Sequence, residues 1–230
     1  MEAAIKTRGH GQMGRLKIQR TPTIRRMPTY LHKLYRMQQE GKTYVSCTEL
    51  AQYMNIELIV ARKDIAMTGL AGHRRYGYKI NDLITAIREY VGWNKVIHAV
   101  LVGAGALGSA LLGYQDFSSY GLAIDFVFDN SPAKIGTSVH GHPVEDIALL
   151  HYKIASLKPK IGIICVGNPS AQHVADLLIA EGIRYIWNFA NVCLSVPEGV
   201  IVQREVIAGG LAVLAAKIKS VEAGEKTSED

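Results

Sequence analysis

Val96-Ile-His-Ala-Val-Leu-Val-Gly-Ala-Gly-Ala-Leu-Gly108 is the stretch that decides the fold of this 230-residue chain. Its first part is a near-continuous apolar run, which is typical of a strand buried on both faces of a sheet. The glycines at 103, 105 and 108 follow in the spacing G-x-G-x-x-G, and an apolar helical pattern continues to Leu112. The first glycine permits a tight turn, the second lets a pyrophosphate approach the backbone, and the third lets the helix pack on the strand. The stretch therefore predicts the strand, loop and helix that open a dinucleotide-binding domain of the Rossmann type.

A second strand over residues 123–128 ends at an acidic residue. Asp129 lies twenty-one residues after Gly108, where a carboxylate can bind both ribose hydroxyls of an adenosine. The same carboxylate repels a 2′-phosphate, so the pattern favours NAD(H) over NADP(H). The alternative is a strand-end carboxylate that caps the turn at Ser131 and Pro132. We predict that the cofactor is held by Gly103, Ala104, Gly105, Ala106, Leu107, Gly108, Asp129, Asn130, Lys134, Val166 and Asn188.

The alternation of strand and helix continues after this acid. Apolar strands over residues 161–166 and 183–187 flank a helix over residues 170–181. This βαβ rhythm predicts a doubly wound parallel sheet and an α/β fold. Gly167-Asn168 and Asn188-Phe189 follow the two strands, at the carboxyl edge where ligands bind in such sheets.

Positive charge is concentrated in the first part of the chain. Residues 1–95 contain 17 Lys and Arg against 7 Asp and Glu, whereas residues 96–230 contain 9 against 13. A charge confined to one half is expected of a surface that meets phosphates. The change of sign near Trp93 also indicates two domains.

The basic half has the pattern of a helix-turn-helix. Pro28 can begin a first helix, which ends at Gly41. Ser46-x-x-Glu49 has the form of a capping box and predicts a short second helix. Asn55 can take the left-handed conformation that a tight turn needs, and a third helix is expected over residues 57–67.

The third helix carries two cations. Lys63 lies well off the apolar stripe of this helix, so we expect it to reach the DNA groove first. Arg62 lies at the edge of the stripe, where it can pack its stem and contact a phosphate. Asp64 is a candidate ion-pair partner of Arg62.

Residues 71–80 alternate glycine, arginine and aromatic residues, which predicts a two-stranded wing with Arg74 and Arg75 at its tip, placed to enter a minor groove. Asn81 is expected to cap a last helix that ends at Gly92. A helix, a helix-turn-helix, a wing and a helix make a winged-helix domain. The alternative is a basic helical module that binds only other proteins. The predicted DNA contacts are Arg25, Arg26, Ser46, Thr48, Arg62, Lys63, Arg74, Arg75 and Tyr78.

These observations divide the chain into segments. We expect a flexible basic arm over residues 1–22, a winged-helix domain over 23–93, a Rossmann domain over 94–205, a terminal dimerisation helix over 206–221 and a disordered tail over 222–230. The terminal helix can cover its own domain or pair with a second subunit. Its single apolar stripe consists of Ile207, Leu211, Leu214 and Ile218.

The composition points to a cytoplasmic protein without a metal or a catalytic set. Cys47, Cys165 and Cys193 are far apart and odd in number, unlike a zinc site or a disulfide scaffold. The basic N-terminus lacks the apolar run of a secretory signal. The uncharged stretch around the fingerprint is rich in glycine and predicts a buried strand and helix, with no membrane span. His140-x-His142 has no nearby acid or cysteine at ligand spacing, which favours a surface loop.

The chain resembles the Rex family of bacterial redox-sensing transcriptional repressors, from about Thr23 to Lys219. Several unrelated short motifs carry the resemblance in the same order. They are Arg26-Met-Pro-Thr-Tyr30, Val60-Ala-Arg-Lys-Asp64, Tyr76-Gly-Tyr78, Val102-Gly-Ala-Gly-Ala-Leu-Gly108, Asn188-Phe-Ala190 and Val196-Pro-Glu-Gly-Val200.

The resemblance implies a homodimer whose winged helices bind an inverted repeat in double-stranded DNA, with the terminal helices swapped between subunits. It implies that NAD⁺ permits DNA binding and that NADH releases it, and it places Tyr114 near the nicotinamide. One position departs from the family, which usually has an Asp near the start of the last helix. Val206 stands there, with Glu205 beside it, so either Glu205 substitutes or the two cofactor forms are distinguished more weakly.

Two other classes of function remain open. One is an NAD-dependent oxidoreductase with an N-terminal helical extension, although no acid and base set accompanies the fingerprint. The other is an interaction protein that binds CoA or a nucleotide and no DNA, because similar sheets also hold CoA.

Overall fold

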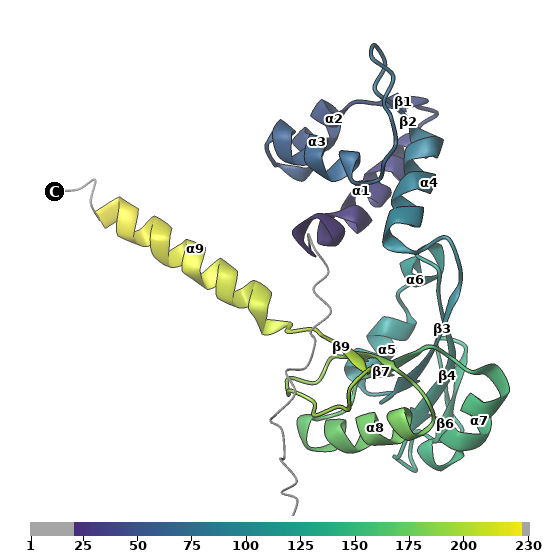
Figure 1. The fold of residues 1–230 in the computed structure, drawn as a ribbon. Coiled ribbons are helices and arrows are strands. Elements are labelled where there is room, and N and C mark those ends of the chain that lie inside the picture. Colours follow the sequence, from purple (N-terminus) through teal and green to yellow (C-terminus); the bar gives the residue numbers. More distant parts are fainter. Residues whose placement is uncertain (1–20, 227–230) are drawn as a thin grey trace, which may run out of the picture. The chain divides into compact units, whose positions relative to one another are not determined.

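The computed structural model of the chain describes residues 21–226, and the side chains of residues 21–223 (Figure 1). These residues divide into two compact units between Asn94 and Lys95. The basic arm expected over residues 1–22 lies outside the described residues, apart from Thr21 and Pro22. Those two residues belong to the first helix and not to an arm.

The first unit is helical, with one small antiparallel sheet. The helices share one core, to which α1, α2, α3 and α4 contribute Leu31, Leu50, Ile65 and Ile87 respectively. The elements are α1 (Thr21–Gln39), β1 (Tyr44–Val45), α2 (Cys47–Met54), α3 (Leu58–Ala66), β2 (Tyr78–Lys79) and α4 (Ile80–Val91).

Local signals at the helix-turn-helix are confirmed. The Ser46 hydroxyl accepts from the Glu49 amide at 3.2 Å, and the Glu49 carboxylate accepts from the Ser46 amide at 2.9 Å, so both bonds of the capping box form. Asn55 ends α2 in the left-handed region, with φ 50° and ψ 51°. The chain can therefore turn directly into α3.

The first helix begins earlier than expected, because α1 starts at Thr21 and Pro28 lies inside it. A proline within a helix removes one backbone hydrogen bond. The turns before Pro28 are held instead by side chains, since Thr23 and Arg26 both donate to Asp64 of α3. A contact between distant residues thus overrides the local start signal.

The wing is smaller than expected. Within residues 71–80 the two sides are joined by a single bridge between His73 and Gly77, and β2 pairs with β1 instead. Asn81 is not the cap of α4, because Lys79 precedes the helix. The Asn81 side chain accepts a hydrogen bond from Gln38 at 2.7 Å.

The second unit is built on a seven-stranded sheet in the order β5-β6-β4-β3-β7-β8-β9. Only the β5–β6 pair is antiparallel. Numbering the parallel strands along the chain gives the order 3-2-1-4-5-6, which is that of dinucleotide-binding sheets. The strands are β3 (Ile97–Val102), β4 (Leu122–Asp129), β5 (Ser138–Val139), β6 (His142–Asp146), β7 (Ile161–Ile164), β8 (Tyr185–Asn188) and β9 (Ile201–Arg204).

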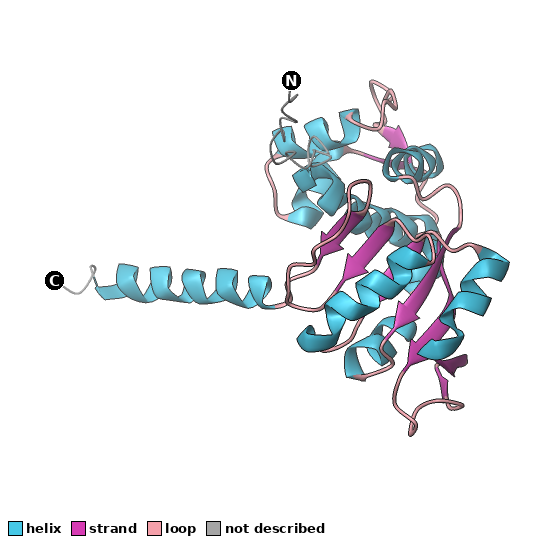
Figure 2. Ribbon diagram, turned by 60° about the horizontal axis from the view of Figure 1, so that its bottom comes forward, coloured by secondary structure: helices cyan, strands magenta, loops and turns pink. Residues whose placement is uncertain are grey.

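Helices lie on both faces of this sheet (Figure 2). Ala99 and Leu101 of β3 belong to one buried cluster, while Val100 and Val102 belong to another. Successive side chains of a strand point to opposite faces, so both faces are covered and the doubly wound parallel sheet is confirmed. The helices are α5 (Ala106–Leu112), α6 (Asp116–Ser119), η1 (Ile147–Leu149), α7 (Leu150–Leu157) and α8 (Asn168–Ala180).

The last helix, α9 (Ala208–Lys226), carries exposed apolar side chains. It continues beyond Val221, so the tail expected to be disordered from residue 222 is helical to Lys226; residues 227–230 lie outside the described part of the chain. None of the helices in residues 21–226 has the length and apolar character needed to cross a membrane.

Candidate cofactor cavity and DNA-binding surface

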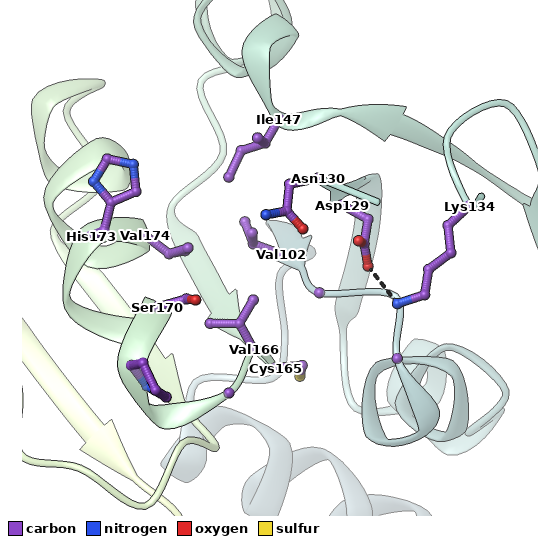
Figure 3. A pocket seen from close by; sticks show the side chains of 14 residues that line it. Val102, Asp129, Asn130, Lys134, Ile147, Cys165, Val166, Ser170, His173 and Val174 are labelled. Atoms are coloured by element: carbon purple, nitrogen blue, oxygen red, sulfur yellow. Dashed lines mark hydrogen bonds and ion pairs between the residues drawn. The ribbon is translucent and has the colours of Figure 1, made fainter. Parts of the chain in front are cut away.

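A cavity of about 500 Å³ opens at the carboxyl ends of β3, β4 and β7 (Figure 3). In the strand order of this sheet, β3 and β7 are the neighbours at which the winding direction reverses, and ligands of such sheets bind there. The lining residues are Val102, Gly103, Gly105, Asp129, Asn130, Lys134, Ile147, Cys165, Val166, Gly167, Pro169, Ser170, His173 and Val174.

The three fingerprint glycines have different environments. Gly103 has φ +106°, and a Cβ there would meet the Cys165 carbonyl at 2.7 Å. A Cβ on Gly108 would collide with the Gly103 carbonyl oxygen. Around Gly105, by contrast, the nearest atom is the Lys134 Nζ, at 4.0 Å. Gly103 and Gly108 are therefore needed for the turn and for packing, and Gly105 leaves room for a ligand against the backbone.

Asp129 lies at the edge of the cavity with its carboxylate fixed from three sides. Its Oδ2 accepts from the Ala104 amide at 2.8 Å and from Lys134 at 3.0 Å, and its Oδ1 accepts from the Ser131 amide at 2.9 Å. Burial alone raises the pKa of Asp129, but these hydrogen bonds outweigh burial and the pKa lies below its ordinary value. The carboxylate is charged, caps the turn at Ser131 and still borders the cavity, so the two interpretations of Asp129 are compatible.

Half of the predicted cofactor residues line the cavity, namely Gly103, Gly105, Asp129, Asn130, Lys134 and Val166. Ala104, Ala106, Leu107, Gly108, Tyr114 and Asn188 are not among the lining residues. Asn188 is fully buried and holds the loop after β8, since its amide donates to the Val192 carbonyl and accepts from the Ala190 amide. Its role in the structure is internal, and a direct contact with cofactor stays a prediction.

The start of α8 forms a wall of the cavity, and the sequence placed Gly167 at this ligand-binding edge without naming any α8 side chain as a cofactor contact. Gly167, Pro169 and Ser170 lie at the start of this helix, and His173 follows one turn later (Figure 3). The available signal was the position of Gly167 directly after a buried strand. Cys165 also lines the cavity, and burial raises the pKa of its thiol to about 12, so the thiol stays protonated.

Tyr114 belongs to a row of aromatic rings in the second unit. Its ring centroid lies 4.8 Å from that of Phe117, which lies 5.7 Å from that of Trp187. The Trp187 indole donates to the Glu205 carboxylate at 3.2 Å. Val206 is 41% exposed and is not part of this row. Contacts thus lead from Glu205 to Tyr114 through two rings.

In the first unit, one face of α3 is exposed. Arg62 and Lys63 both lie on it, whereas Ala61 and Ile65 are buried. Exposed positions among the other predicted DNA contacts are Arg25, Thr48, Arg74 and Arg75. These side chains are accessible to a DNA backbone or groove.

Asp64 pairs with Arg26, so the expected pairing with Arg62 is wrong. The Arg26 guanidinium donates to both carboxylate oxygens, at 2.6 and 2.8 Å, and Thr23 and Tyr30 donate at 2.8 and 3.0 Å. Burial alone raises the pKa of Asp64, but the hydrogen bonds from Arg26 and its two neighbours hold the pKa below its ordinary value. The structure therefore gives Arg26 an internal role in joining α1 to α3.

Two further predicted DNA contacts are engaged within the unit. The Ser46 hydroxyl is used in the capping box. Tyr78 is half-buried, and its ring lies so close to Gly72 that a Cβ there would come within 2.9 Å. Tyr76 is the exposed wing tyrosine instead, with the Arg75 guanidinium 5.7 Å from its ring centroid.

No group of three His, Cys, Asp or Glu side chains in residues 21–223 is arranged to hold a metal ion. Of the histidine pair, His140 occupies a turn with φ 48° and His142 begins β6.

Known proteins match both units of the chain. Residues 21–66 match a family model described as "Putative DNA-binding protein N-terminus" and residues 94–192 match one described as "CoA binding domain". The redox-sensing transcriptional repressor Rex of Treponema denticola is 41% identical over 202 residues, which are 88% of this chain and 96% of that relative. The chain belongs to the Rex family. The Rex repressor of Bacteroides fragilis is 34% identical over 84% of the chain and 88% of the relative.

Solved structures of a Rex repressor have the same fold as this Rex-family chain. The repressor RSP in complex with β-NADH matches with a TM-score of 0.79 at 28% identity, covering 92% of this chain and 99% of RSP. RSP in complex with β-NAD⁺ and operator DNA matches with a TM-score of 0.78 at 29% identity, covering 91% of this chain and 96% of RSP. The resemblance stated from the motifs is confirmed, as is the combination of a winged helix with a Rossmann-type sheet.

Proposed function

We propose that this protein is a transcriptional repressor whose affinity for operator DNA depends on the NADH/NAD⁺ ratio, and that it is a regulator and not an enzyme. One observation carries this proposal: a unit with an exposed basic recognition helix and a unit with a dinucleotide cavity stand in one chain. Rex relatives that share both units are named redox-sensing repressors, and RSP is solved with NADH and with NAD⁺ and operator DNA.

The cavity suits NAD(H) as the cofactor. The space over Gly105 and the adjacent Lys134 ammonium fit a diphosphate, and the Asp129 carboxylate fits a ribose diol and disfavours a 2′-phosphate. Ser170 and His173 lie on the side of the cavity away from Asp129 (Figure 3). The bound nicotinamide supplies the redox signal, because its ring is cationic when oxidised and neutral when reduced.

DNA is bound by the first unit. We propose that Lys63 on α3 contacts base edges in the major groove while Arg62 contacts phosphates. Arg74 and Arg75, in the turn of the wing, enter a minor groove. Arg25 and Thr48 add contacts to the backbone of the duplex.

The functional form is a homodimer joined through α9 and bound to an inverted repeat. The apolar stripe of this helix is exposed in a single chain, where Leu211 is 68% and Leu214 is 56% exposed. A second copy of the helix would cover these side chains. We propose that the two helices are exchanged between subunits. The domain limits near residues 93 and 205 belong to the same proposal.

We propose that Glu205 has the role of the Asp that most family members have at the position of Val206. Its carboxylate reaches the ring row of Trp187, Phe117 and Tyr114, so a charge on a nicotinamide beside Tyr114 would interact with it. An anion favours the cationic, oxidised ring. The Glu205→Gln variant should therefore bind NAD⁺ more weakly relative to NADH than the wild type does, measured by calorimetric titration of both.

A repressor must reach its operator DNA, so we propose a cytoplasmic location.

Moving the DNA-bound fraction from about 99% to about 1% requires about 5.5 kcal/mol of differential affinity between two arrangements of the dimer. A single ring charge can supply part of that where the bound cofactor is shielded from water.

The direct test is a titration of operator duplex, followed by fluorescence anisotropy, with NAD⁺, with NADH and without cofactor at one fixed salt concentration. We expect tight binding with NAD⁺ and weak binding with NADH. Equal operator affinity in all three conditions would contradict the sensing function and leave only DNA binding. Turnover of a hydroxy or keto acid with a change in nicotinamide absorbance would favour the oxidoreductase alternative instead.

A further inference from the structure

The exposed face of α3 contains an apolar side chain that no core requires. Ile59 is 51% exposed and belongs to none of the buried clusters of the described chain. Arg62, Lys63 and Ala66 follow it at i+3, i+4 and i+7 and are exposed as well. The outward stripe of the recognition helix is therefore isoleucine, two cations and alanine.

The position of Ile59 on this stripe restricts what it can contact. It is the second residue of α3, and the N-terminal residues of a recognition helix are those that reach base edges in the major groove. One turn later, Arg62 contacts a phosphate and Lys63 contacts base edges in the proposed complex. When Arg62 and Lys63 face DNA, Ile59 on the same stripe faces the floor of the groove.

Only one base presents an apolar group there. The C5-methyl of thymine distinguishes it from the other bases in the major groove, and apolar side chains read it by contact. We propose that Ile59 is a specificity-determining residue that selects thymine at one position of each operator half-site by packing against this methyl group. The proposal rests on the function proposed above.

Uracil provides a direct test, because it keeps the hydrogen-bonding edge of thymine and lacks only the methyl group. The probe is the tightest duplex that the wild-type protein selects from a random-sequence pool, with each thymine replaced in turn by uracil in both half-sites. One position should weaken wild-type binding by about fourfold per half-site, or about fifteenfold for the symmetric pair, as expected for one buried methyl group.

The variant Ile59→Ala should lose sensitivity to uracil at that position and keep the wild-type sensitivity at every other thymine. Ile59→Val, which retains a branched apolar side chain, should keep part of it. Ile201→Ala is the matched control, because Ile201 is 41% exposed in the second unit, and its uracil profile should equal that of the wild type. Thermal melting of each variant checks that the fold is retained.

Three results would overturn the inference. They are a wild-type profile without any uracil-sensitive position, an undiminished uracil penalty in Ile59→Ala, and a change of oligomeric state in Ile59→Ala, which would assign Ile59 to a protein contact. If the wild type selects no duplex above scrambled DNA, the proposed function fails and the inference falls with it. Selection of a duplex with an unchanged uracil penalty removes the inference alone.

Discussion

At the scale of single residues, Asp64 shows how a buried carboxylate joins two helices. It accepts from Arg26, Thr23 and Tyr30 and is 1% exposed. Nothing in the spacing of the sequence distinguishes this pair from the pairing with Arg62 that we expected, because both arginines carry the same charge. Only the packing of α1 on α3 decides which arginine Asp64 meets.

Replacing Asp64 with Asn should lower the free energy of unfolding by about 3 kcal/mol, because the Arg26 charge then lacks its partner. Urea unfolding measures this, and Asp82→Asn, at an exposed carboxylate in α4, should cost less than about 1 kcal/mol. If Asp64→Asn kept wild-type stability but bound operator more weakly, the result would indicate that Arg26 contacts DNA.

The same carboxylate predicts a pH dependence. Its pKa in the folded state is below the ordinary value of 3.8, so its contribution to stability is complete above that value and is lost as the pH falls through the folded pKa. The difference in unfolding free energy between wild type and Asp64→Asn should therefore shrink below about pH 4. A difference that grows on acidification would contradict the assigned charge.

Asp129 has a structural role and a proposed role in cofactor binding, and the two can be separated. Asp129→Asn should weaken NADH binding by about tenfold, since a charge-assisted hydrogen bond to ribose is lost, and should narrow the preference for NADH over NADPH. Fluorescence titration with both cofactors gives the two affinities. If the carboxylate served only the Ala104 and Ser131 amides, both affinities would fall together and the preference would stay unchanged.

At the scale of elements, the sequence predicts those parts whose signal is local. The fingerprint loop, the capping box of α2 and the left-handed Asn55 each depend on a few adjacent residues, and all were found as expected. The start of α1, the β1–β2 pair and the extra strand β9 depend on contacts between distant segments. Local propensity does not encode such contacts, so these elements were missed or misplaced.

The recognition helix and the wing should respond differently to truncation. Lys63→Ala is expected to weaken operator binding and relax its sequence specificity, because a base contact is lost. Arg74→Ala should lower the affinity for operator and for scrambled duplex alike and reduce the salt dependence of binding. Anisotropy titrations at several salt concentrations check both, and wild-type operator affinity in either variant would remove its assigned contact.

The exposed stripe of α9 predicts the oligomeric state. Leu214→Glu places a charge at the middle of the proposed dimer contact and should shift the protein from dimer to monomer in sedimentation velocity. Ala216→Glu, on the opposite side of the helix, is the matched control and should remain dimeric. A dimer in both variants would place the subunit contact elsewhere.

At the scale of the whole molecule, the order of the units carries the functional argument. A dehydrogenase would pair its cofactor domain with a substrate domain, whereas this chain pairs it with a winged helix. All residues that line the cavity belong to the second unit. Six of the fourteen lining residues were predicted from the sequence, because the fingerprint and the acid after the second strand are motifs. The side chains of α8 were missed because they belong to no motif, and only the edge at Gly167 follows from strand order.

We propose that cofactor and operator share one equilibrium between two arrangements of a dimer. Linkage requires each ligand to change the affinity of the other by the same factor. The most direct measurement is the NADH dissociation constant with and without saturating operator duplex, by calorimetry at one salt concentration. The duplex should weaken NADH binding by the factor by which NADH weakens duplex binding. An NADH affinity that is identical with and without duplex would contradict this linkage.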